Sequence, residues 1–145
     1  MRAGASALAV FAALFALQPL GLRAAEDPDY VSPLGPITEA CRSFNAAGRY
    51  AQSLAYCRSA ADAYPRELSR GARVFATYRN AAEMLSFAAA DELGLGQSGA
   101  ALRTAYTAHQ YLRYVDSKLH ITPDQRQDVY HLASVLQRIE QTARR

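Results

Sequence analysis

The chain of 145 residues lacks tryptophan, contains two cysteines and has a single lysine, Lys118. Valine and isoleucine are sparse, and no segment reads as a strand. Alanine dominates the apolar half of the composition, and alanine favours helices but is depleted in strands. The composition therefore predicts an all-α fold, and the length predicts one domain with a modest core.

The N-terminal residues have the pattern of an export signal. Arg2 precedes an uncharged run over residues 3–17, Pro19 interrupts it, and small residues offer a cleavage point near Ala24 or Ala25. The alternative is an uncleaved membrane anchor, which Gln18, Pro19 and the weak hydrophobicity of alanine make poorer. We therefore expect residues 1–25 to be removed and the mature chain to be periplasmic or secreted, with no stable membrane insertion.

The net charge does not indicate a nucleic-acid partner. The whole chain carries a formal charge of +3, from 16 basic and 13 acidic residues. Removing Arg2 and Arg23 with the signal leaves 14 basic residues against the 13 acidic ones, a nearly neutral mature chain. We therefore expect no binding to nucleic acid.

The two cysteines lie where a helix hairpin would bring them together. Asn45 and Gly48 indicate a turn, so one helix is predicted to end near Ala47 and the next to begin near Tyr50. The midpoint between Cys41 and Cys57 falls on this turn, which places both cysteines at the same level of an antiparallel pair. In an oxidising compartment this predicts a disulfide. A catalytic or metal-binding pair would instead call for Cys-x-x-Cys spacing or a nearby histidine.

The same stretch resembles a tetratricopeptide (TPR) unit, a helix hairpin of about 34 residues. The positions that carry the resemblance are Ile37, Ala40, Cys41, Phe44, Gly48, Tyr50, Ser53, Cys57, Ala60 and Pro65. Cys41 replaces the usual glycine and Cys57 the usual aromatic residue. These positions face one another in such a hairpin, so the resemblance implies that a disulfide replaces their packing. It also implies a right-handed stack of about five helices that binds proteins or peptides.

A second hairpin and a final helix are predicted after the first one. Apolar spacing predicts a long helix from Glu67 to Leu93, with Gly71 at a bend, followed by a helix that Ser98 caps. The buried face of that next helix is predicted to consist of Ala101, Ala105, Ala108, Leu112 and Val115. An ordinary helical bundle remains the alternative to a second repeat.

The chain is predicted to end in a capping helix. Thr122 and Gln125 form a capping box, Pro123 occupies the first position, and the buried stripe is Val129, Leu132, Leu136 and Ile139. This helix would cap residues 37–145, the TPR-like domain. Residues 26–36 are proline-rich and aperiodic, and they are predicted to form an extended arm.

Two motifs could indicate a ligand, and each has a simpler interpretation. The segment GLGQSG, residues 94–99, has the glycine spacing of a dinucleotide loop but follows a helical run and not a strand, which favours a helix-to-helix turn. A possible divalent metal site consists of His120, Asp124, Asp128 and His131. Acidic residues in a first helical turn are also favoured by the helix dipole alone. We expect neither a cofactor nor a metal, and the metal site belongs to the alternative of a compact bundle.

Polar aromatic residues suggest a binding surface for a protein or peptide. Tyr106, Gln110 and Tyr114 form one stripe of a predicted helix, and Tyr50 begins another. The alternative is that these rings cover a joint between helices, against Tyr78 and Tyr130. The three histidines have no evident serine or cysteine nucleophile beside them, so no catalytic residue is predicted. An enzyme would require a deep cleft that gathers His109, His120 or His131 with an acid.

Overall fold

The computed structural model describes residues 24–145, which are helical apart from the arm, the turns and the last residue. The predicted export signal lies almost entirely outside these residues. Five α-helices and one 3-10 helix follow one another: α2 (Gly35–Ala46), α3 (Tyr50–Ala63), η1 (Tyr64–Arg70), α4 (Val74–Gly94), α5 (Ser98–Lys118) and α6 (Pro123–Ala143). The all-α fold class is confirmed.

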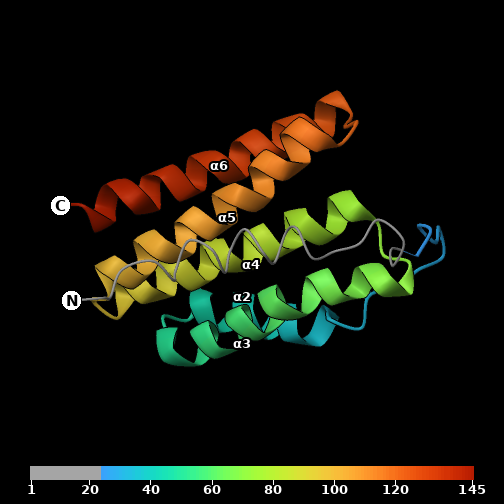
Figure 1. Ribbon diagram of the computed structural model, residues 1–145. Helices are drawn as coiled ribbons and strands as arrows, with labels where there is room; N and C mark the ends of the chain where they lie inside the picture. The colour runs from blue at the N-terminus through green and yellow to red at the C-terminus, as the bar shows by residue number, and fades with distance from the viewer. Residues whose placement is uncertain (1–23) are drawn as a thin grey trace, which may run out of the picture.

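The helices form a stack of antiparallel hairpins with α4 at its centre (Figure 1). Helices α2 and α3 make the first hairpin and α4 and α5 the second, while α6 covers the outer side of α5. Helix α4 packs against α2 and α3 on one side and against α5 and α6 on the other. Each helix is therefore adjacent to its neighbours in sequence, as the short turns require.

Glycine ends three of the helices in the same way. Gly48, Gly71 and Gly96 have φ values of 71°, 92° and 74°, in the left-handed region that glycine adopts without steric penalty. At each site the glycine N–H donates to the carbonyl three residues back, and the next N–H donates to the carbonyl five residues back. This is the Schellman arrangement, so the predicted turns at Gly48 and before Ser98 have equivalent geometry.

The predicted helix from Glu67 to Leu93 is wrong at its first part. Helix α3 ends at Ala63, just before Pro65, and a 3-10 helix then occupies Tyr64–Arg70, where the long helix was predicted to begin. Gly71 then reverses the chain, and α4 begins at Val74. Gly71 is therefore a helix terminator and not a bend inside a long helix, because its φ of 92° is incompatible with helix continuation.

The last two helices match their predicted buried faces. All five residues predicted for α5 are buried, and in α6 Val129, Leu132 and Leu136 are buried while Ile139 is partly so. The Thr122–Gln125 capping box is present, with both of its hydrogen bonds. Ser98 is not the N-cap, however, since Gln97 occupies that position and no side chain caps α5.

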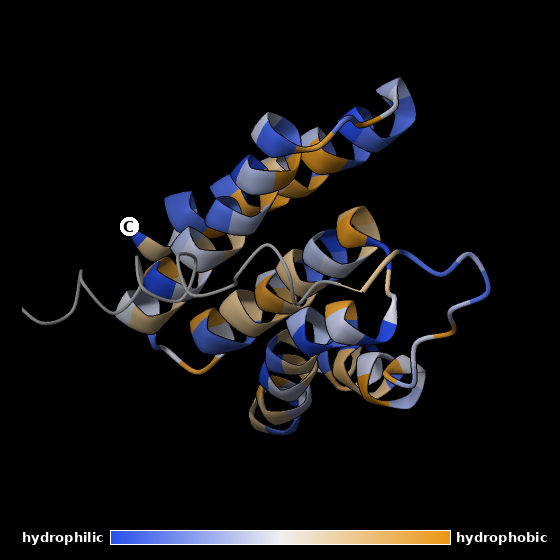
Figure 2. Ribbon diagram, turned by 45° about the vertical axis from the view of Figure 1, so that its right-hand side comes forward, coloured by the Kyte–Doolittle hydropathy of each residue, from blue (hydrophilic) through white to orange (hydrophobic). Residues whose placement is uncertain are grey.

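Two clusters of buried residues share α4. Ala81, Met84 and Ala88 face the cysteine hairpin, whereas Tyr78, Ala82 and Ala89 belong to the cluster with α5 and α6. Alanine at so many of these positions lets the backbones approach closely. In Figure 2 the outward side of α6 is hydrophilic and apolar residues recur where helices face each other. The two-sided burial of α4 explains why it holds both hairpins together.

The arm before α2 is attached to the start of α4. The Asp27 N–H donates to the Gly71 carbonyl at 2.7 Å, and Glu26 Oε1 accepts from the Val74 N–H at 2.9 Å. The arm is slightly shorter than predicted, because α2 begins at Gly35 with Pro36 in its first turn. Across residues 24–145, none of the helices combines the length and apolar character that a membrane span requires.

Candidate functional site

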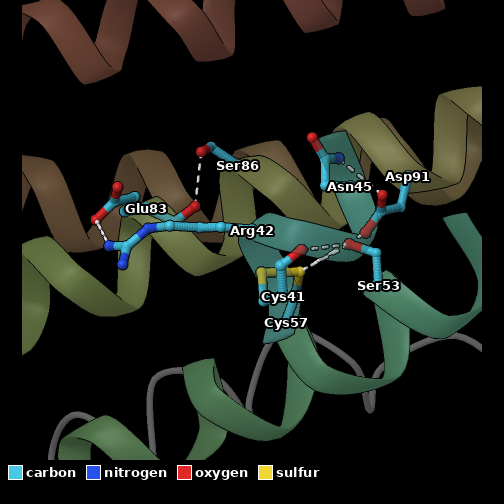
Figure 3. The surroundings of a disulfide bond; sticks show 8 residues. All are labelled: Cys41, Arg42, Asn45, Ser53, Cys57, Glu83, Ser86 and Asp91. Carbon is cyan, nitrogen blue, oxygen red and sulfur yellow. Dashed lines mark hydrogen bonds and ion pairs between the residues drawn. A yellow bond between two sulfur atoms is a disulfide. The ribbon is translucent and has the colours of Figure 1, made fainter. Parts of the chain in front are cut away.

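The two cysteines form a buried disulfide between α2 and α3 (Figure 3). Their Cα atoms are 4.9 Å apart, and both side chains are completely buried. The Ser53 hydroxyl donates to the Cys41 carbonyl at 2.9 Å and lies 3.4 Å from Cys57 Sγ. The predicted pairing is therefore confirmed, and both sulfurs are consumed in the crosslink rather than available to a metal.

A buried carboxylate from α4 lies beside the disulfide. Asp91 Oδ2 is 3.6 Å from Cys57 Sγ, and Asp91 Oδ1 accepts a hydrogen bond of 2.8 Å from Asn45 Nδ2 (Figure 3). Burial raises the pKa of Asp91, the bonds from Ser53 and Asn45 oppose this, and the charge of Glu92 adds to the rise. Asp91 thus connects both helices of the first hairpin to α4.

A surface groove lies between α3 and α5 and includes Leu85 of α4. It has a volume of about 670 Å³. Its lining combines apolar, hydroxyl and charged side chains: Arg58, Asp62, Leu85, Ala100, Leu102, Arg103, Thr104, Tyr106 and Thr107. The ring of Tyr106 is the large exposed apolar group on this lining, with 59% of its surface accessible. The mixed polarity of this groove suits a chain segment rather than a compact apolar ligand, because small-molecule pockets are lined predominantly by apolar side chains.

A buried glutamate fixes the two walls of this groove. Glu92 of α4 is completely buried, pairs with Arg58 of α3 and accepts from the Thr104 hydroxyl of α5 at 2.8 and 3.1 Å. Both partners line the groove. Neither Asp91 nor Glu92 is among the predicted site residues, although their positions three residues after Ala88 and Ala89 in an apolar helix could have indicated burial.

The structure separates the four residues predicted to bind a partner. Only Tyr106 of the four lines the α3–α5 groove. Tyr114 packs edge-on against Tyr78 at 4.9 Å between ring centroids, as the alternative of a helix joint anticipated. Gln110 is half-buried farther along α5.

Tyr50 lies apart from the other three residues, where α3 meets the end of α4. Its ring lies against the backbone of Gly94, where an added Cβ would clash with the ring. Close approach of α3 to the end of α4 therefore depends on glycine at this position.

The residues of the possible metal site have other surroundings. Asp128 accepts two hydrogen bonds from Arg79 of α4, at 2.7 and 3.1 Å. His120, Asp124 and His131 are exposed. Within the part of the chain that the structure describes, no three histidine, cysteine, aspartate or glutamate side chains converge as metal ligands.

The histidines do not gather in one place. His109 of α5 pairs with Glu140 of α6, which links the capping helix to its neighbour, whereas His120 and His131 are exposed. Residues 94–99 form the end of α4, the turn and the start of α5. This is the predicted helix-to-helix turn, which does not follow a strand.

No known protein family matches the chain, and comparisons with curated proteins and with solved structures found no match either.

Proposed function

We propose that the chain is an exported, TPR-like module that binds an extended segment of a partner protein in the α3–α5 groove. The observation that carries this proposal is the exposed ring of Tyr106 in a groove whose walls a buried glutamate holds in place. A rigid groove loses little entropy when a segment binds to it. The module acts by binding and not by catalysis.

The charges of the groove define the partner segment. Asp62 on the α3 side and Arg103 on the α5 side line the groove, and neither forms an ion pair among residues 24–145. Between them Leu85 and Tyr106 supply apolar surface. We expect a segment with an apolar residue between a basic and an acidic one, because it pairs with both free charges and covers the Tyr106 ring.

Two observations support export. The disulfide is typical of proteins that fold in an oxidising compartment, and the N-terminal apolar run has the pattern of a signal. The TPR-like interpretation is supported by the helix-hairpin stack and by the buried small residues Ser53 and Ala60 beside Cys57. In TPR-like arrays such stacking leaves an open face for partners.

The proposal can be tested by photo-crosslinking in the native cell. A photoreactive phenylalanine analogue is placed at position 106, and at position 130 as the matched control, since Tyr130 is similarly exposed on α6. We expect an adduct with a partner from position 106 that is absent from position 130 and is lost in Arg103→Glu. Identical adducts from both positions, or no adduct from position 106, would contradict the proposal.

A further inference from the structure

A second cavity lies between the N-terminal arm and the start of α4. Its volume is about 270 Å³, and the arm forms one wall while η1 and α4 form the other. The lining residues are Pro28, Tyr30, Ser32, Tyr64, Glu67, Ala72, Arg73, Ala76, Thr77 and Asn80. This volume is just below the roughly 300 Å³ at which ligand pockets usually begin, so the cavity suits a small metabolite.

Two of the residues that line this cavity each carry a buried polar atom without a hydrogen-bond partner. Among residues 24–145, Tyr30 Oη and Glu67 Oε2 are the buried side-chain oxygens without a partner. Glu67 is only 3% exposed, and its other oxygen accepts from Arg70 Nη1 at 3.1 Å. A buried carboxylate oxygen without a donor is unfavourable, and native structures satisfy nearly all such groups. Both atoms can therefore accept a hydrogen bond from a ligand, and the Tyr30 hydroxyl can also donate one.

The remaining lining defines the charge of that ligand. A carboxylate oxygen such as Glu67 Oε2 can accept a hydrogen bond from an ammonium group, which aromatic rings also attract, and Tyr30 and Tyr64 both line this cavity. Arg73 lies on the same lining and forms no ion pair among the described residues, so it is free to bind a carboxylate. The cavity thus carries one acidic side chain, Glu67, and one basic side chain, Arg73. This pair suits a small molecule that has both a positive and a negative charge.

The wall formed by the arm is held in place without a ligand. Its attachments at Asp27 and Glu26, described above, lie directly before Pro28 and Tyr30. The cavity is therefore largely formed in advance, which favours binding of a small molecule because little of the chain must be ordered.

We infer that this cavity binds a free α-amino acid, with its ammonium group at Glu67 and its carboxylate at Arg73. The inference is independent of the α3–α5 groove, which shares no lining residue with this cavity. The ligand side chain lies toward the Tyr30 and Tyr64 rings. The arm, η1 and α4 are then joined through one bound molecule.

The test is calorimetric titration of the purified, oxidised protein with glycine, L-alanine, L-leucine, L-glutamate and L-lysine, each alone. N-acetyl-L-alanine, which lacks the ammonium group, and L-alaninamide, which lacks the carboxylate, serve as control probes. We expect saturable binding of at least one amino acid and no binding of the N-acetyl compound. No binding of any amino acid at millimolar concentration, or equal binding of N-acetyl-L-alanine and L-alanine, would overturn the inference.

Two variants test which residue binds each charged group of the ligand. Glu67→Gln is expected to weaken amino-acid binding by about tenfold or more, because a charge-assisted hydrogen bond is lost. Arg73→Gln is expected to abolish the preference for L-alanine over L-alaninamide. Asp124→Asn, on the exposed start of α6, is the matched control and leaves binding unchanged. Far-UV circular dichroism verifies folding, and unchanged affinity in a folded Glu67→Gln protein would also overturn the inference.

Discussion

Cys41 and Cys57 are 16 positions apart in the chain, yet their Cα atoms are 4.9 Å apart at the same level of an antiparallel hairpin. The α2–α3 turn at Gly48 lies midway between them, so each cysteine is about two helical turns from it. The crosslink therefore joins α2 and α3, the two helices of the hairpin that packs against α4.

Removal of the crosslink should lower the stability of the whole stack. Closing a loop of about 15 residues stabilises a fold by about 3 kcal/mol, so Cys41→Ala/Cys57→Ala should lose about that much free energy of unfolding. Urea denaturation of the purified protein measures it. Dithiothreitol should destabilise the wild type by a similar amount and leave the double variant unaffected. An unchanged urea midpoint in both cases would show that the crosslink does not stabilise the hairpin.

Much of the fold could be predicted from sequence because local signals agreed with tertiary packing. The α2–α3 turn, the disulfide, the buried face of α5 and the capping box at Thr122 all depend on spacing and on residues near in sequence. Gly71 was misassigned because apolar periodicity continues through Leu68 and Phe75, and only the left-handed φ of the glycine separates η1 from α4.

The candidate sites were less predictable, because long-range contacts make them. Glu92 joins Arg58 and Thr104 from two other helices, and Glu67 lines one cavity together with Tyr30 of the arm, which is far away in sequence. Tyr114 was assigned to a binding surface, with a joint against Tyr78 as the alternative, and helical spacing alone does not decide between the two. These contacts follow from how the hairpins stack and not from any local pattern.

Asp91 should make stability depend on pH in a defined direction. Burial raises its pKa in the folded protein above the ordinary value of 3.8, so the unfolded chain ionises first as the pH rises. The contribution of Asp91 to the free energy of unfolding is therefore fully present below pH 3.8. It is lost as the pH rises through the pKa of Asp91 in the folded protein. The variant Asp91→Asn cannot ionise, so it should not lose stability in this way, and its amide oxygen can still accept the hydrogen bond from Asn45.

The free energies of unfolding of wild type and Asp91→Asn should be compared by urea denaturation across the acidic range. Relative to the wild type, the variant should gain stability as the pH rises above 3.8 and then reach a plateau. Asp62→Asn, on the exposed face of α3, is the matched control. A difference in free energy of unfolding between wild type and Asp91→Asn that stays constant with pH would contradict the raised pKa of Asp91.

Gly71→Ala should destabilise the start of α4. An alanine at φ 92° is strained by about 1 kcal/mol or more, and its Cβ would lie 3.0 Å from Asp27 Cβ and 3.3 Å from the Ala25 carbonyl. The arm should therefore detach, which faster proteolysis before Leu34 would reveal. Gly35→Ala is the control, since nothing lies within 4 Å of its added Cβ. Equal proteolysis of the two variants would argue against the role of Gly71.

Thr122→Ala should weaken the capping helix. The Thr122 hydroxyl accepts from the Gln125 N–H at 3.2 Å, and loss of such a cap lowers stability by about 1 kcal/mol. Thr142→Ala near the other end of α6 removes only a bond to the Arg138 carbonyl and should change stability by less than about 0.5 kcal/mol. Thermal unfolding followed by circular dichroism compares the two variants, and similar melting temperatures would contradict the cap.

The central claim is that an oxidised hairpin, formed on export, holds the stack together, and the thiol state in the native cell tests it most directly. Cells are quenched in acid, free thiols are alkylated under denaturing conditions without reductant, and the protein is analysed by mass spectrometry. The account predicts no alkylation, and a reductant-sensitive linkage between the peptides that carry Cys41 and Cys57. Alkylation of both cysteines before any reduction would contradict it.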